Sequence, residues 1–231
     1  MTPVERRWVG AVAVVAWAGV AMRVVLDVGN ISPGGVLDRG LLGPYHAGVL
    51  GIAQRLLDSA SYFTYWSNVL IAVALTRVWR HPDLDTTRRR HGYATALIMI
   101  TLTGVLYAAL IAPSDVVTGW NIPDNVVIHY AVPVLSVATW VIIGPRGAFS
   151  WRESGAIYPV PLAYLGYTLL RGALIHRYPY GFFNVVSLGY RTVVVTMLVI
   201  LVASYLVVAL FVLLDQRRGR GVRRSSRSLT P

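Results

Sequence analysis

The chain of 231 residues contains no cysteine and no lysine. Without cysteine it can form no disulfide, thiolate nucleophile, iron–sulfur cluster or thiolate metal site. Without lysine it can form no catalytic Schiff base, and its basic residues are all arginines, as codon bias in a GC-rich genome would produce. The histidines and aspartates of residues 81–91 do not have the spacing of a known metal site. We therefore expect neither a metal nor a cofactor.

Charged residues are also scarce, at 13% of the chain. A water-facing surface needs roughly a quarter of its residues charged. The net charge of +11 would suggest a nucleic-acid partner on a soluble domain, but 55% of the residues are hydrophobic and the mean hydropathy is +0.58. This composition excludes a nucleic-acid-binding domain and a disordered basic protein, and it favours an integral membrane protein.

Six segments are long and apolar enough to cross a membrane. A spanning helix needs roughly 17 to 25 mostly apolar residues, because the hydrocarbon core is about 30 Å thick and a helix rises about 1.5 Å per residue. The segments are 8–28, 62–79, 92–112, 125–143, 156–175 and 192–214. We therefore expect an all-α membrane protein with six transmembrane helices in one domain, residues 1–214. Residues 46–60 carry apolar side chains at helical spacing, which predicts an interfacial helix or an outward extension of the second span.

The arginines predict the orientation. Arginine is retained on the cytoplasmic side of short loops. With both termini in the cytoplasm, 15 arginines lie inside and 6 lie at or beyond the outer ends. We expect a multi-pass protein of the plasma membrane, of the bacterial inner-membrane type. Residues 215–231 are rich in Arg, Gly and Ser, which predicts a disordered cytoplasmic tail that anchors the topology or contacts anionic lipid headgroups.

Polar side chains are expected to gather in the outer-leaflet layer of this bundle. Polar groups within a membrane are costly, and they are therefore candidates for function. The residues that reach this layer include Thr64, Ser67, Asn68, Thr103, Tyr107, Asn125, His129, Tyr164, Tyr167, Thr168, Arg171, Tyr180 and Asn184. This placement predicts one cavity that opens outward or toward lipid.

Several short blocks resemble a known family. They are YFTYWSN at 62–68, HYAVP at 129–133, Tyr167 with Arg171-Gly172, and YPY at 178–180 followed by Phe182 and Gly189-Tyr190. In this order they resemble the androgen-induced-gene-like integral membrane proteins, most closely an actinobacterial branch, from about residue 62 onward. Animal members are threonine hydrolases that cleave fatty acid esters of hydroxy fatty acids within the membrane. The resemblance implies that Thr64 is the nucleophile and His129 the general base.

The predicted depth of the other polar residues in the membrane indicates supporting roles for some of them. Asn125, one turn before His129, could orient the imidazole, and Asn68, Arg171 or Tyr180 could donate to an oxyanion. Tyr107, Tyr167 and Asn184 complete the predicted substrate-binding set.

The chain also departs from the family pattern. Asn184 stands where bacterial members often have an acid, and Ser67 and Asn68 stand where animal members have an acid after the threonine.

Three functions stay open at this point. The first is an intramembrane ester hydrolase that takes an acyl lipid or another amphiphilic substrate. The second is a non-catalytic binding protein or small transporter, in which Arg171 pairs with the anionic head of its ligand. The third is a scaffold subunit of an envelope assembly. A hydrolase requires Thr64 and His129 to lie within hydrogen-bond reach, whereas a binding protein requires only the cavity and Arg171.

Overall fold

A computed structural model describes residues 1–31, 39–144 and 149–227. It is 78% helical, and the described residues contain no strand. The α-helices are α1 (Pro3–Val28), α2 (Gly48–Ser59), α3 (Phe63–Arg80), α4 (Thr87–Leu106), α5 (Asn121–Val126), α6 (Val132–Ile142), α7 (Pro159–Ile175) and α8 (Val185–Arg227). Two π-helical turns, Tyr107–Ile111 and Val127–Ala131, extend α4 and join α5 to α6. Short 3₁₀ turns, Ser154–Ile157 and Gly181–Phe183, precede α7 and α8.

The prediction of an all-α protein is confirmed, and each of the six predicted segments overlaps one continuous helical stretch. Within the described residues, four stretches are long and apolar enough to cross a membrane. They are Pro3–Val28, Thr87–Ile111, Asn121–Ile142 and Val185–Arg217. Helices α3 and α7, of 18 and 17 residues, are not among these four stretches. Their crossing of a membrane and the cytoplasmic placement of the termini stay predictions.

Helices α1, α4 and α8 begin several residues before the predicted spans, at Pro3, Thr87 and Val185, and two larger differences concern α2 and the end of α8. Helix α2 is separate from α3, so residues 46–60 form a helix of their own and do not extend the second span. Helix α8 continues to Arg227, past the expected end at Leu214 and into the stretch expected to be a disordered tail. Gln216 and Arg217 are good helix formers, and no proline follows before Pro231. Residues 228–231 of that tail lie outside the described residues.

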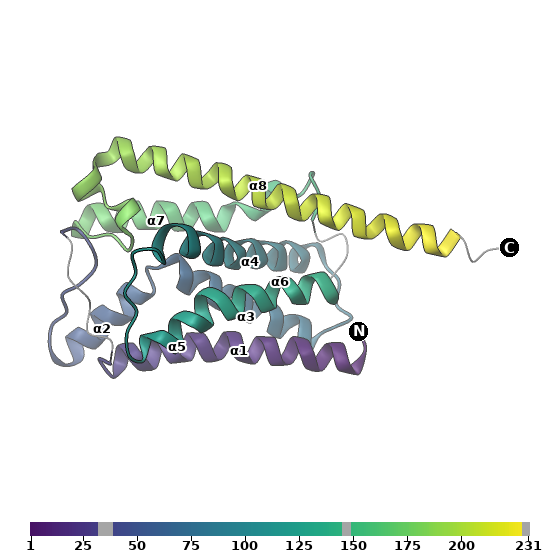
Figure 1. Ribbon diagram of the computed structural model, residues 1–231, viewed down its shortest axis with the longest axis horizontal. Coiled ribbons are helices and arrows are strands. Elements are labelled where there is room, and N and C mark those ends of the chain that lie inside the picture. The colour runs from purple at the N-terminus through teal and green to yellow at the C-terminus, as the bar shows by residue number, and fades with distance from the viewer. Residues whose placement is uncertain (32–38, 145–148, 228–231) are drawn as a thin grey trace.

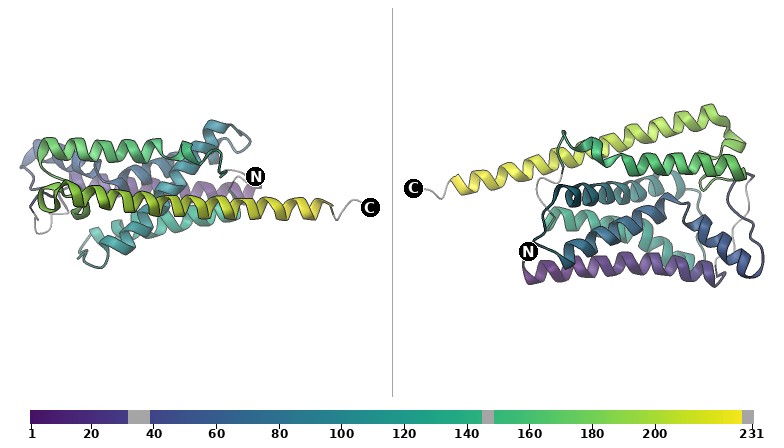
Figure 2. Two further views of the ribbon diagram at one scale, coloured as in Figure 1. Left: turned by 90° about the horizontal axis from the view of Figure 1, so that it is seen from above. Right: turned by 180° about the vertical axis from the view of Figure 1, so that it is seen from behind.

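The helices lie roughly side by side, with both chain termini at one end (Figure 1). We call this the terminal end, and the end where α3 begins and α4 stops the site end. Helix α4 lies between α3 and α6 on one side and α7 and α8 on the other, and α1 covers α3 and α6 (Figures 1 and 2). Residues 93–100 of α4 are all buried. A helix that is apolar on every side belongs in such a central position.

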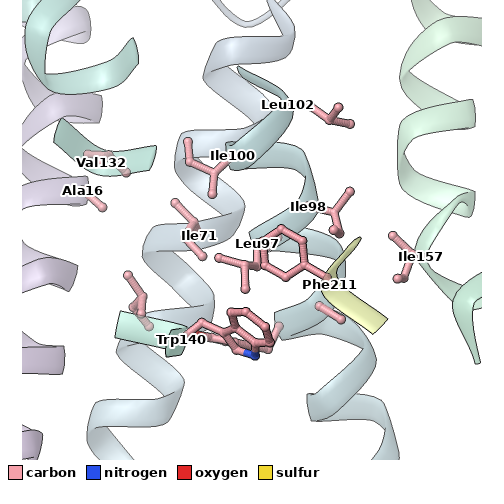
Figure 3. Close-up of a cluster of buried hydrophobic side chains, with 14 of the residues drawn as sticks. Ala16, Ile71, Leu97, Ile98, Ile100, Leu102, Val132, Trp140, Ile157 and Phe211 are labelled. Carbon is pink, nitrogen blue, oxygen red and sulfur yellow. The ribbon is translucent and has the colours of Figure 1, made fainter. Parts of the chain in front are cut away.

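The apolar core lies around α4, and Figure 3 shows Leu97, Trp140 and Phe211 within it. The rings of Trp140, Phe149 and Phe211 pack there with centroids 4.7 to 5.5 Å apart. Leu97 and Ile71 contribute from α4 and α3, and both are fully buried. The core therefore joins α1, α3, α4, α6 and α8, and its ring cluster lies at the end away from the predicted site.

Helix α8 has the opposite environment from α4. In its most apolar stretch only 28% of the residues are buried, against 56% for α4. Large side chains such as Val195, Leu198, Val202 and Leu206 point outward. An exposed apolar patch of this extent is typical of a surface that contacts lipid or another protein. The pattern fits a helix at the edge of a membrane bundle.

Candidate functional site

Thr64 and His129 meet at the site end of the bundle. Thr64 lies in the first turn of α3 and His129 lies in the π turn between α5 and α6. The Thr64 Oγ1 is 3.2 Å from the His129 Nε2, across 65 residues of sequence. This distance is within the reach that proton transfer requires.

Proline chemistry explains the π turn that carries His129. Pro133 has no N–H, so the His129 carbonyl lacks its usual donor four residues on. The backbone bonds shift by one residue, and the Val132 N–H bonds to the Val127 carbonyl. A Cβ on Gly104 would lie 3.3 Å from the His129 carbonyl oxygen and 3.0 Å from Pro133. The glycine thus lets α4 approach the π turn closely.

The second π turn places Tyr107 against His129. Its ring stacks on the imidazole with centroids 3.8 Å apart and an angle of 14° between the planes. Pro113 follows this turn and cannot continue the helix. Because π turns inside helices often occur at functional sites, two of them in contact mark this end of the bundle.

Behind the imidazole a chain of hydrogen bonds leads away from Thr64. The His129 Nδ1 is 2.5 Å from the Asn125 Oδ1, and the Asn125 Nδ2 donates to the Tyr107 Oη over 2.6 Å. The Tyr107 hydroxyl donates to the Asp115 Oδ2 over 2.8 Å. Sequence reasoning expected Asn125 beside His129 but missed Asp115. The sequence feature that could have indicated Asp115 is its position as an acidic residue in the loop, eight residues after Tyr107.

Two further residues fix the backbone of Thr64. The Asn68 Nδ2 donates to the Thr64 carbonyl over 2.8 Å and to the Ile128 carbonyl over 3.2 Å. The Ser67 hydroxyl donates to the Thr64 carbonyl over 2.9 Å and lies 2.6 Å from the Thr103 hydroxyl. Asn68 therefore joins α3 to the histidine turn, and its role in the structure is positioning.

Tyr180 approaches Thr64 from the loop before α8. Its hydroxyl oxygen accepts a long hydrogen bond of 3.4 Å from the Thr64 backbone N–H. This N–H is one of those that the first turn of a helix leaves without an intrahelical partner. Burial raises the pKa of Tyr180, which keeps the phenol protonated at neutral pH. The hydroxyl is thus a potential donor beside Thr64.

A cavity lies next to Thr64, between α4, α7 and α8. It holds about 630 Å³ of empty space, including its open mouth. Thr64, Tyr107 and Tyr180 line its polar side, and Leu165, Ile200 and Leu201 are among the apolar residues of its wall. The polar groups of the site thus face a mostly apolar chamber, as in many sites for amphiphilic ligands.

Five of the seven predicted substrate-binding residues do not line this cavity. Asn68 and Asn125 hold Thr64 and His129 in place, and the other three have partners elsewhere. The Arg171 Nη2 lies 2.5 Å from the Asp58 Oδ1 of α2. The Tyr167 hydroxyl lies 2.9 Å from the Ser61 hydroxyl. The Asn184 Oδ1 accepts from the Val186 and Ser187 N–H groups and caps α8. The structure therefore brings Thr64, His129, Asn68, Asn125, Tyr107 and Tyr180 together and leaves these three apart.

Neither a protein-family model, nor a curated protein, nor a solved structure matches this chain. Among the described residues, no three His, Asp or Glu side chains are grouped so as to hold a metal ion. In the part of the chain that the structure describes, the fold and the site define an all-helical protein with four candidate membrane-spanning helices and a half-buried threonine–histidine pair. A function for that pair rests on its own geometry.

Proposed function

We propose that the protein is an intramembrane carboxylic ester hydrolase that acts on fatty-acyl esters, with Thr64 as nucleophile and His129 as general base. The observation that carries this proposal is the 3.2 Å separation of the Thr64 Oγ1 and the His129 Nε2. A threonine hydroxyl is a poor nucleophile until a neighbouring base takes its proton. Asn125, on the other ring nitrogen, supplies the orienting third group of such an arrangement.

The reaction proceeds in two halves. His129 takes the proton of Thr64 as the Thr64 oxygen bonds to the ester carbonyl carbon. The tetrahedral intermediate collapses, the bond to the alcohol oxygen breaks, and the imidazolium returns the proton to the departing alcohol. A water molecule, deprotonated by the same imidazole, then attacks the acyl-threonine ester. This second collapse releases the fatty acid and restores Thr64.

The oxyanion requires donors near the Thr64 oxygen. The Thr64 N–H points out of the first turn of α3, at the positive end of the helix dipole. The Tyr180 hydroxyl lies 3.4 Å from that N–H. The oxygen of a substrate carbonyl beside Thr64 would accept hydrogen bonds from both the Thr64 N–H and the Tyr180 hydroxyl. These two groups would then no longer bond to each other. Removal of one such donor costs roughly 10²-fold in turnover.

The surroundings favour an acyl substrate. The cavity wall of Leu165, Ile200 and Leu201 suits an alkyl chain. We infer that all six segments span the membrane with both termini in the cytoplasm, which places the site in the outer half of a plasma membrane of the bacterial inner-membrane type. The motifs that resemble threonine hydrolases favour esters of hydroxy fatty acids as substrates.

A direct test uses the full chain, purified in mild detergent, with fatty-acyl esters of hydroxy fatty acids. We expect Thr64→Ala and His129→Ala each to lower turnover by about 10³-fold or more. Thr101→Ala is the matched control, since this threonine of α4 bonds only to the Leu97 carbonyl of its own helix. A fluorophosphonate probe should label the wild type and not Thr64→Ala. Unchanged turnover in both site variants would refute the hydrolase.

The alternative, a non-catalytic binding protein or transporter for an anionic amphiphile, has weaker support. It needs Arg171 to pair with the ligand, but the Asp58 carboxylate already lies 2.5 Å from this guanidinium. It also gives no role to the hydrogen bond between Thr64 and His129.

A further inference from the structure

The hydrogen-bond chain behind His129 ends on a carboxylate that the reaction above does not use. Asp115 lies on the loop after α4 and is exposed. A carboxylate accepts hydrogen bonds and cannot donate them. The Tyr107 hydroxyl must therefore donate to the Asp115 Oδ2, 2.8 Å away. The carboxylate thus sets the direction of the first bond in the chain.

The direction of this first bond determines which atom donates in each of the remaining bonds. With its proton turned to Asp115, the Tyr107 oxygen can only accept from Asn125, so the amide nitrogen must face it at 2.6 Å. The amide oxygen then faces the imidazole and accepts the Nδ1–H over 2.5 Å. A neutral imidazole that carries its proton on Nδ1 leaves the Nε2 lone pair free. Nε2 is the atom that faces the Thr64 hydroxyl.

We propose that Asp115 is a positioning residue that holds His129 in the Nδ1–H tautomer through Tyr107 and Asn125. Its catalytic value rests on the proposed hydrolase, but the tautomer itself does not. Without the carboxylate, Tyr107 can donate to the Asn125 oxygen and the amide reverses. The amide nitrogen then donates to Nδ1, and the proton moves to Nε2. In that state the imidazole cannot accept a proton from Thr64.

The hydrogen-bonded series from His129 to Asp115 is suited to this role because its residues are held in place. Stacking of the Tyr107 ring on the imidazole fixes both rings, and Asn125 lies one helical turn from His129. Asp115 is the exposed link, so replacing it leaves the buried packing intact. The effect of its removal can therefore be separated from a folding defect.

The experiment uses the full chain with ¹⁵N-labelled histidine, in lipid nanodiscs at neutral pH. His129→Gln assigns the His129 ring resonances. We expect the wild-type Nε2 to give the shift of an unprotonated nitrogen. Asp115→Leu and Tyr107→Phe should each move Nε2 toward the shift of a protonated nitrogen, and combining them should add little. Asp115→Glu keeps a carboxylate on the loop and should restore the wild-type shift.

Asp83→Leu is the matched control, because Asp83 is an exposed acid on the loop between α3 and α4 at the terminal end; it should leave the shift unchanged. Ester turnover in Asp115→Leu should fall about 10- to 100-fold. A protonated Nε2 in the wild type, or an Nε2 shift that Asp115→Leu and Tyr107→Phe both leave in place, overturns the proposal. Absence of turnover in the wild type would count against the hydrolase alone, since the tautomer shift is read without substrate.

Discussion

Packed rings occur at both ends of the bundle, and the site end adds a series of hydrogen bonds around Thr64 and His129. At the terminal end Trp140, Phe149 and Phe211 fill space with packed rings. At the site end directional hydrogen bonds link Thr64 to His129, His129 to Asn125 of α5, and Asn125 to Tyr107. Packing is stabilising because it excludes solvent and fills volume, whereas hydrogen bonds fix the angle and distance between particular atoms.

This difference indicates that the terminal end mainly stabilises the fold, whereas the site end mainly positions Thr64 and His129. A buried polar network adds little net stability when its partners are satisfied, but it specifies one arrangement. The apolar core can tolerate small adjustments in rotamer, while a threonine–histidine pair loses its function after a shift of about 1 Å. Substitutions among the packed rings of the terminal end should therefore affect folding, and substitutions in the hydrogen-bond series of Thr64, His129 and Asn125 should affect chemistry.

The strongest test of this comparison is Trp140→Ala. Removal of a fully buried tryptophan leaves a cavity and should destabilise the protein by about 3–5 kcal/mol. Thr64→Ala should cost far less, because it removes one hydroxyl from a half-buried position. Thermal unfolding in mild detergent measures both variants. Equal losses of Tm in the two would show that the ends do not differ in this way.

The ion pair between Arg171 and Asp58 tests the site end. Arg171→Met leaves the Asp58 carboxylate, whose side chain is only 10% exposed, without its partner. We expect a loss of about 2 kcal/mol, below the usual value for a fully buried pair because the arginine is 22% exposed. Adding Asp58→Leu should recover most of the loss. If Arg171→Met unfolds like the wild type while ligand binding is lost, the binding-protein alternative gains support.

The cavity between α4, α7 and α8 gives a smaller effect. Ser204 lines it, so Ser204→Phe should occupy space that we assign to an acyl chain. Binding of a fluorescent long-chain fatty acid should weaken about tenfold, or about 1.4 kcal/mol. Leu206→Phe is the control, because Leu206 points outward from the same helix. Equal affinity in the two variants would show that the acyl chain of the fatty acid binds outside this cavity.

The smallest effect is expected in the loop between α3 and α4. Hydrogen bonding to Arg90 lowers the pKa of Asp85 below its value of 3.8 in the unfolded chain. The pair therefore adds stability above about pH 4, and that stability is lost as the pH falls through the lowered pKa. Asp85→Asn should lower Tm slightly at pH 7, and the difference between the two proteins should shrink as the pH falls below about 4. A difference that grows on acidification would contradict this sign.

The depth of the site residues could be predicted from the sequence. A helix rises by a constant amount per residue, so the distance from a span's end fixes the layer of Thr64, Tyr107, Asn125 and His129. The boundaries of the apolar helices followed from length and hydropathy in the same way. The end of α8 could not be predicted from hydropathy, because Gln216 and Arg217 are polar and yet favour helix.

Rotation about each helix and contacts made by loops were not predictable. Helical spacing assumes 3.6 residues per turn, and the two π turns change which way Tyr107 and His129 point. Asp115 belongs to no periodic pattern, so only the folded chain brings it to Tyr107. The partner of Arg171 was missed for the same reason, since Asp58 lies on the separate helix α2.

A π turn is equivalent to one residue inserted into an α-helix. Deleting a single residue from Val127–Ala131 would leave a continuous helix of unchanged hydropathy and nearly the same length. It would, however, rotate everything before the deletion by about 100° relative to α6. If the deleted residue is Tyr130 or Ala131, Asn125 and His129 would rotate together away from Thr64 while Pro133 stayed in place. The proposed catalytic arrangement thus depends on residue count, and a length change of one can abolish it with Thr64, Asn125 and His129 all still present.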